Sequence, residues 1–400
     1  MNINSLAFLS SAFYPASVGT FVTTLIGLST LQSESPFVSS SVFALPFLIT
    51  IFVAPLMARA IKNRSPETLL NLQYISRFLV AVAVSFCCYY IYKQSNNVLI
   101  PYIFLMLLLS GDQVLTSDAP LLANQVYNTA FSRTTAFGNL FTRGFQSITP
   151  LLAAYMIVEN RNGFWILVIA LSLLYGFFYP HILSKHSNIQ LALPDKKAGA
   201  NKPIYTPYHT NKAWGLWFIS FNVLVNLSQG AVAFVLISVD PKLYGPIYSS
   251  VLYGAFLIIQ ILVVSGLVDF QNFSARPSTV GIFLLINAFG LSVLAFLTNF
   301  WFIAGAVSLI GLVYGVSVPL LSEVILARLR GPNFRQHLAN AKSGGRLASV
   351  LALWLAGIAL SAGVASNHLL LLSGVLLGLS AVLLFVIASR LEKAERLSIT

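Results

Sequence analysis

The segment KHSNIQLALPDKKAGANKPIYTPYHTNK, residues 185–212, is the longest polar stretch in a strongly apolar chain. Of the 400 residues, 57% are hydrophobic and 8% are charged, and the mean hydropathy is +0.82. A soluble globular chain carries about 25% charged residues. The composition therefore indicates a polytopic membrane protein, which the polar segment divides into two apolar halves.

Apolar runs long enough to cross a bilayer recur on both sides of that segment. A spanning helix needs about 20 mainly apolar residues, and the sequence predicts twelve, six in each half. The expected spans are 5–31, 38–58, 70–92, 98–120, 134–158, 163–184, 213–238, 244–268, 279–298, 300–322, 338–363 and 368–389. We expect an all-α protein with six-helix bundles at 1–185 and 213–400 and a cytoplasmic loop at 186–212.

The basic residues predict the orientation, because they accumulate in the cytoplasmic loops of membrane proteins. With the N-terminus inside, sixteen lysines and arginines fall in cytoplasmic segments, and the outer loops hold only Lys93, Arg161 and Lys242. Both termini are therefore expected in the cytoplasm. The favoured location is the bacterial inner membrane, and the favoured oligomeric state is a monomer. The net charge of +12 reflects this topology and does not indicate nucleic-acid binding.

Six helices plus six around a basic central loop resemble the major facilitator superfamily of secondary transporters, across essentially the whole chain. That superfamily carries G-x-L-x-D-R-x-G-R-R after its second span, where an acid and arginines latch helix ends. The corresponding stretch here is APLMARAIKNR, residues 54–64, which keeps Arg59 but has Ala58 in place of the acid. The equivalent stretch in the second half is GLVD, residues 266–269, which ends in Asp269. The resemblance implies a cytoplasmic gate at Arg59 and Asp269, with ordinary loop charges as the alternative.

Two other superfamily patterns are degraded. The arginine expected shortly before a glycine on span four is absent, because residues 107–110 before Gly111 are Leu-Leu-Leu-Ser. Of the drug-exporter pattern G-x-x-x-G-P-x-x-G on span five, only Pro150 matches. These departures disfavour a standard multidrug and proton antiporter, which stays as an alternative.

Asp112 and Arg143 lie inside the apolar runs of spans four and five. Charges at such depth are costly and usually functional. Arg143 is ten residues beyond Arg133, which at about 1.5 Å per residue places it about 15 Å into the membrane. Asp112 lies twelve residues before the polar Asn124, which places it at a similar depth in the membrane. We expect an ion pair in which Asp112 couples transport to protons and Arg143, freed when Asp112 is protonated, binds the anionic solute. A fixed structural pair is the alternative.

A related arrangement occurs in the second half. Glu323 and Lys342 lie at matched distances from the turn near Pro332. Arg346 follows Lys342 by one helical turn, on the same face. Glu323 is the second candidate for proton coupling, and Lys342 and Arg346 are candidate solute-binding residues.

Neutral polar residues also share a helix face on span seven. Asn222, Asn226 and Gln229 are four and three residues apart, a spacing that places them on one side of a helix. They either line a solute path or bond a neighbouring helix. Tyr14 is the candidate at the related place in span one. Arg77 on span three is a further candidate, with extension of its side chain to the membrane interface as the alternative.

The charged residues expected within the membrane would give a central cavity a net positive charge. Two are acidic, Asp112 and Glu323, and four are basic: Arg77, Arg143, Lys342 and Arg346. The sequence therefore predicts a secondary active transporter working by alternating access. We expect proton-coupled export of a small anionic or zwitterionic solute, such as a carboxylate metabolite or a siderophore. An importer or a lipid flippase of the same fold remains open.

Enzyme classes find little support in the sequence. H-E-x-x-H, G-x-x-x-x-G-K and G-x-S-x-G are all absent, so zinc hydrolysis, ATP-driven pumping and serine-esterase chemistry are not indicated. Cys87 and Cys88 are adjacent, a spacing that suits neither a disulfide framework nor a zinc site. We expect no enzymatic activity, no cofactor and no bound metal.

Overall fold

The computed structural model describes about half of the chain, and every described secondary-structure element in it is a helix. The described residues are 35–61, 68, 72, 75–84, 86, 103, 106–109, 111–112, 208–239, 251, 254–255, 257–259, 261–262, 277–328 and 334–399. A helix satisfies its backbone hydrogen bonds internally, which an apolar segment in lipid must do. The all-α prediction is confirmed.

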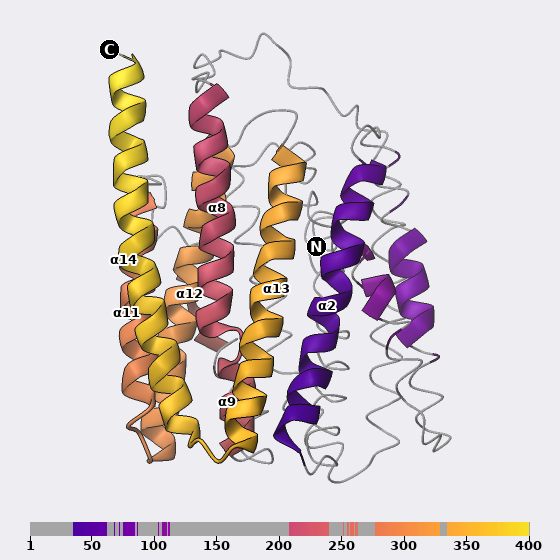
Figure 1. Cartoon of the computed structure of the whole chain (residues 1–400), viewed down its shortest axis with the longest axis vertical. Helices are drawn as coiled ribbons and strands as arrows, with labels where there is room; N and C mark the ends of the chain where they lie inside the picture. Colours follow the sequence, from indigo (N-terminus) through magenta and orange to yellow (C-terminus); the bar gives the residue numbers. More distant parts are fainter. Residues whose placement is uncertain are drawn as a thin grey trace.

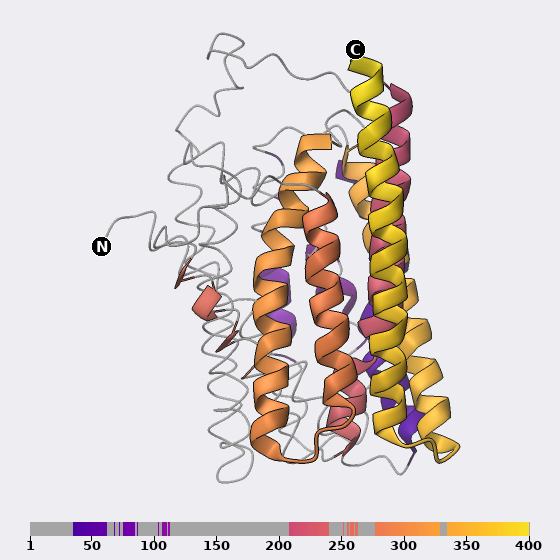
Figure 2. The ribbon, with the colours of Figure 1, turned by 90° about the vertical axis from the view of Figure 1, so that its left-hand side faces the viewer.

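The long helices run side by side along one direction of the molecule (Figures 1 and 2). Their bounds are α2 Pro36–Ile61, α8 Tyr208–Gln229, α9 Val232–Val239, α11 Pro277–Leu294, α12 Phe300–Arg328, α13 Phe334–Ser361 and α14 Ser366–Ile399. Four stretches are long and apolar enough to cross a membrane: Pro36–Met57, Lys212–Leu236, Asn340–Ser361 and Ser366–Ala394. These helices form a bundle of the kind that a multi-pass membrane protein requires.

The predicted span 213–238 is interrupted. The chain enters it as α8, turns at Gly230 and Ala231, and continues as α9. A side-chain carbon on Gly230 would lie 2.8 Å from the Cα of Ser349 on α13, so this close approach requires glycine. Hydropathy alone could not show the turn, because the residues on both sides of it are apolar.

The last helix is longer than its apolar run. The predicted span ends at residue 389, whereas α14 continues to Ile399. The added residues are mainly Leu, Glu, Lys, Arg and Ala, which have high helix propensity. Hydropathy marks where the apolar segment ends, while propensity extends the helix beyond it.

Helices of the second half pack through small residues, as helices in membranes commonly do. A side-chain carbon on Gly374 of α14 would lie 2.8 Å from the backbone nitrogen of Ser292 on α11. Trp217 on α8 donates a hydrogen bond from Nε1 to the carbonyl of Leu384 on α14, at 3.1 Å. Close backbone approach and this buried bond hold α8, α11 and α14 together.

α2 packs against α13, although they come from different halves of the chain. Ser40 and Ala44 on α2 are fully buried, and Gly357 on α13 has no room for a side chain because Ser40 and Phe37 lie against it. In Figure 1 the two ribbons are closest near the start of α2 and the end of α13, and they lie further apart at their other ends. We call this contact, made by Phe37, Ser40 and Gly357, the α2–α13 seam.

Candidate functional site

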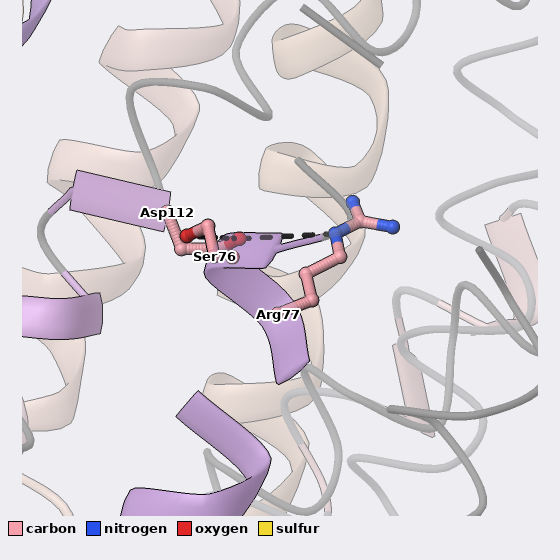
Figure 3. A network of polar contacts seen from close by, with 3 residues as sticks. All are labelled: Ser76, Arg77 and Asp112. Carbon is pink, nitrogen blue, oxygen red and sulfur yellow. Dashed lines mark hydrogen bonds and ion pairs between the residues drawn. The ribbon is translucent and has the colours of Figure 1, made fainter. Parts of the chain in front are cut away.

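Asp112 forms a buried ion pair with Arg77. The Arg77 Nε lies 3.8 Å from the Asp112 Oδ1, and the two side chains are 6% and 2% exposed. Ser76 donates a hydrogen bond from its hydroxyl to the same oxygen at 3.1 Å. In Figure 3 the Nε edge of Arg77 faces the carboxylate, and the terminal nitrogens lie on the far side. The side chain of Arg77 is therefore buried beside Asp112, and its role in solute binding stays a prediction.

The sequence contained a signal for this pair. Arg77 lies seven residues inside the predicted span 70–92, and Asp112 lies eight residues before the end of the predicted span 98–120. In an antiparallel pair of helices those positions share a depth. The predicted partner Arg143 lies outside the described residues, so its pairing with Asp112 stays a prediction.

The amide residues of α8 face α13. Asn222 and Asn226 each donate a hydrogen bond to a carbonyl one turn earlier, Asn222 to Phe218 at 2.9 Å and Asn226 to Asn222 at 2.7 Å. The hydroxyl of Ser349 on α13 donates to the Asn226 Oδ1 at 3.1 Å. These bonds fix Asn226 against α13. This arrangement corresponds to the second of the two predicted roles, in which the amide bonds a neighbouring helix.

Gln229 is held differently from the two asparagines. Both its amide oxygen and its amide nitrogen are buried, and neither has a hydrogen-bond partner within the described part of the chain. Buried polar groups in proteins are nearly always bonded. Gln229 is also the last residue of α8, immediately before the turn at Gly230. The role of Gln229 on the predicted solute path stays a prediction.

Arg346 lies where α13 meets α2. Its guanidinium carbon is 4.8 Å from the centre of the Phe47 ring on α2, a distance at which a cation is attracted to the face of an aromatic ring. Within the described residues no carboxylate forms an ion pair with Arg346. Lys342, one turn earlier on α13, is partly buried. Phe47 was not a candidate from sequence, because one phenylalanine among thirty carries no signal.

The other predicted site residues are described in part or not at all. Arg59 is exposed in the last turn of α2. Glu323 belongs to α12, but its side chain lies outside the described residues. Tyr14, Arg143 and Asp269 are also outside them. No group of three His, Cys, Asp or Glu residues that could hold a metal occurs in the described ranges.

The sequence matches no protein-family model and no curated protein. The structure, by contrast, is similar to solved transporters over nearly its whole length. The crystal structure of the human organic anion transporter MFSD10 (TETRAN) covers 96% of this chain and 98% of its own, with 15% identity and a TM-score of 0.64.

A bacterial homologue of the iron transporter ferroportin is similar as well. Its outward-facing structure with soaked iron covers 97% of this chain and 100% of its own, with 14% identity and a TM-score of 0.66. Its inward-facing structure gives 16% identity and a TM-score of 0.61. These likenesses confirm the major facilitator fold that the arrangement of the apolar runs predicted.

Proposed function

We propose that this protein is a secondary active transporter that exports a small anionic or zwitterionic organic solute, such as a carboxylate metabolite or a siderophore, in exchange for protons. The observation that carries this proposal is the position of Arg346. It lies at the contact between the two halves, and within the described residues its charge is met by an aromatic ring instead of a carboxylate. A cation placed in this way favours an anionic solute.

The remaining polar groups of the proposed site are compatible with such a solute. Lys342 adds a second positive charge one turn from Arg346, and Gln229 offers a buried amide without a bonded partner among the described residues. The similar fold of a human organic anion transporter supports the same substrate class. The binding site would then lie beside α13, where Arg346 faces Phe47 of α2.

Alternating access fits the arrangement of the helices. In the superfamily fold the two halves rock about a site near the membrane midplane. The α2–α13 seam is a contact between the halves, so it must change when they rock. We propose that Asp112 carries the coupling proton, because its protonation would remove the charge that pairs with Arg77. Glu323 is the second candidate.

Transport in liposomes tests the substrate class. Wild-type protein and Arg346→Gln would be reconstituted with an imposed proton gradient and supplied with benzoate, citrate, glutamate or the lipophilic cation tetraphenylphosphonium. We expect gradient-driven transport of at least one anion by the wild type and about a tenfold loss of apparent affinity in Arg346→Gln, the size of one lost charge-assisted hydrogen bond.

The control for this experiment is Arg390→Gln, a substitution in the charged C-terminal part of α14. We expect it to leave the affinity unchanged. Transport of tetraphenylphosphonium alone, with equal affinity in Arg346→Gln, would contradict the proposal.

A further inference from the structure

Two arginines of this chain are held in chemically different ways. Arg77 faces the carboxylate of Asp112 at 3.8 Å, whereas Arg346 faces the ring of Phe47 at 4.8 Å. Each contact joins two different helices: Arg77 and Asp112 lie on consecutive predicted spans, whereas Arg346 on α13 and Phe47 on α2 are distant in sequence.

A carboxylate and an aromatic ring use different parts of a guanidinium group. A carboxylate beside the group offsets its charge, as Asp112 does at 3.8 Å from the Arg77 Nε, which is an ion-pair distance and beyond that of a hydrogen bond. An aromatic ring covers one face of the group and leaves the charge and the in-plane N–H donors in place. An anion arriving at Arg346 would therefore not need to displace a carboxylate of the described part of the chain, whereas one arriving at Arg77 would compete with Asp112.

The position of the ring is set by the α2–α13 seam. Ser40, which lies against Gly357, is seven residues before Phe47, or about two helical turns. Gly357 is eleven residues after Arg346, or about three turns. The ring and the guanidinium therefore meet about two to three turns away from the close contact at Gly357, on the same pair of helices. The Phe47 contact thus places Arg346 at the boundary between the halves.

The side of α13 that carries Arg346 also carries other polar groups. Lys342 is four residues before Arg346 and Ser349 three residues after it, a spacing that keeps all three on one side of the helix. Ser349 is bonded to Asn226 on α8. A solute whose anionic group binds Arg346 would therefore lie one turn from Lys342, while Ser349 is buried against α8.

We propose that Phe47 is a positioning residue: its ring holds the face of the Arg346 guanidinium, so that the in-plane N–H groups bind a two-oxygen anionic group of the solute, such as a carboxylate. The identity of the solute rests on the proposed function, but the role of the ring in orienting Arg346 does not. Arg77, which is paired with Asp112, would have no such role.

Chemical modification tests the arrangement without any solute. Purified wild type, Phe47→Leu and Phe47→Tyr would be treated with phenylglyoxal, and the modified arginines would be measured by peptide mass spectrometry. We expect Phe47→Leu to raise the rate at Arg346 roughly threefold, the factor for losing a weak cation–π contact. Phe47→Tyr keeps a ring and should leave the rate near that of the wild type.

Arg77 is the internal control in the same samples, and its rate should not change in either variant. An equal rise at Arg77 and Arg346 would mean that Phe47→Leu loosens the whole protein. No change at Arg346, or the same rise in Phe47→Tyr, would mean that the ring does not position the guanidinium. Each of these results would overturn the proposal.

Transport kinetics test the consequence for the solute. With an anion that the wild type carries among benzoate, citrate and glutamate, we expect Phe47→Leu to raise KM about fivefold with Vmax within about twofold. Phe47→Tyr should restore KM, and Phe289→Leu, at an exposed phenylalanine of α11, should have no effect. A fall in Vmax at unchanged KM would contradict a positioning role. If the wild type carries none of the three anions, the proposed function fails, and the modification rates alone decide the role of Phe47.

Discussion

Asp112 and Arg77 present the question of whether a buried ion pair is a fixed structural element or a moving part. Removing one partner of such a pair leaves an uncompensated charge and costs about 3–5 kcal/mol, whereas replacing both with apolar residues is often neutral. Ser76 adds a hydrogen bond to the carboxylate, and losing it should cost about 1 kcal/mol. These stability costs test whether the two side chains are paired, and transport then decides between the two roles.

We therefore predict that Asp112→Leu lowers the thermal stability of the purified protein much more than Ser76→Ala does. The double variant Arg77→Met with Asp112→Leu should recover most of the loss, because no charge is left alone. Unfolding would be followed by intrinsic fluorescence in detergent. A double variant as unstable as Asp112→Leu would contradict the pairing.

The same double variant decides whether the pair couples transport to protons. If Asp112 carries the proton, a stable double variant should lose gradient-driven accumulation of the solute in liposomes while still allowing its downhill exchange. Accumulation at the wild-type level would instead identify the pair as a structural staple and direct attention to Glu323.

At the scale of helices, glycine decides which pairs approach closely. Gly357 joins α13 to α2 across the two halves, whereas Gly374 joins α14 to α11 within one half. A side chain at either position needs its neighbour to move. The two glycines therefore form a matched pair for separating motion between the halves from stability within one half.

We predict that Gly357→Val shifts the protein toward states in which the start of α2 and the end of α13 lie apart. Spin labels on cysteines introduced at the exposed positions Val38 and Ser361, with Cys87 and Cys88 replaced by alanine, would report a longer distance by double electron–electron resonance. Gly374→Val should lower thermal stability without lengthening that distance.

Gly305→Val is the neutral control for this experiment, because nothing lies within 4 Å of a side-chain carbon at that glycine. It should change neither the label distance nor the stability. The same distance in Gly357→Val and in the wild type would show that the seam does not oppose separation of the helices.

For the whole molecule, the charge distribution predicts the orientation in the membrane. Sixteen basic residues in the expected cytoplasmic segments against three in the outer loops favour cytoplasmic termini. A green fluorescent protein fused after α14 should therefore fluoresce in bacterial cells, because that reporter does not mature after export in unfolded form. An alkaline phosphatase fused at the same position should be inactive. The opposite pair of results would reverse the topology.

The fold class, the approximate positions of the long helices that the structure describes and the polar face of α8 were predictable from the sequence. Lipid leaves a long apolar run few alternatives to a helix, because every backbone polar group must be satisfied within the segment. The spacing of Asn222, Asn226 and Gln229 likewise follows from helix geometry alone. These properties are local, so neighbouring residues suffice to determine them.

Only the tertiary structure decided which groups meet. It paired Asp112 with Arg77, placed Phe47 beneath Arg346, and interrupted the seventh predicted span at Gly230, where α8 approaches Ser349. Depth matching can restrict the partners of a charge to a few, but the rotation of each helix about its axis selects one. That rotation depends on side-chain packing between helices distant in sequence, which no local pattern encodes.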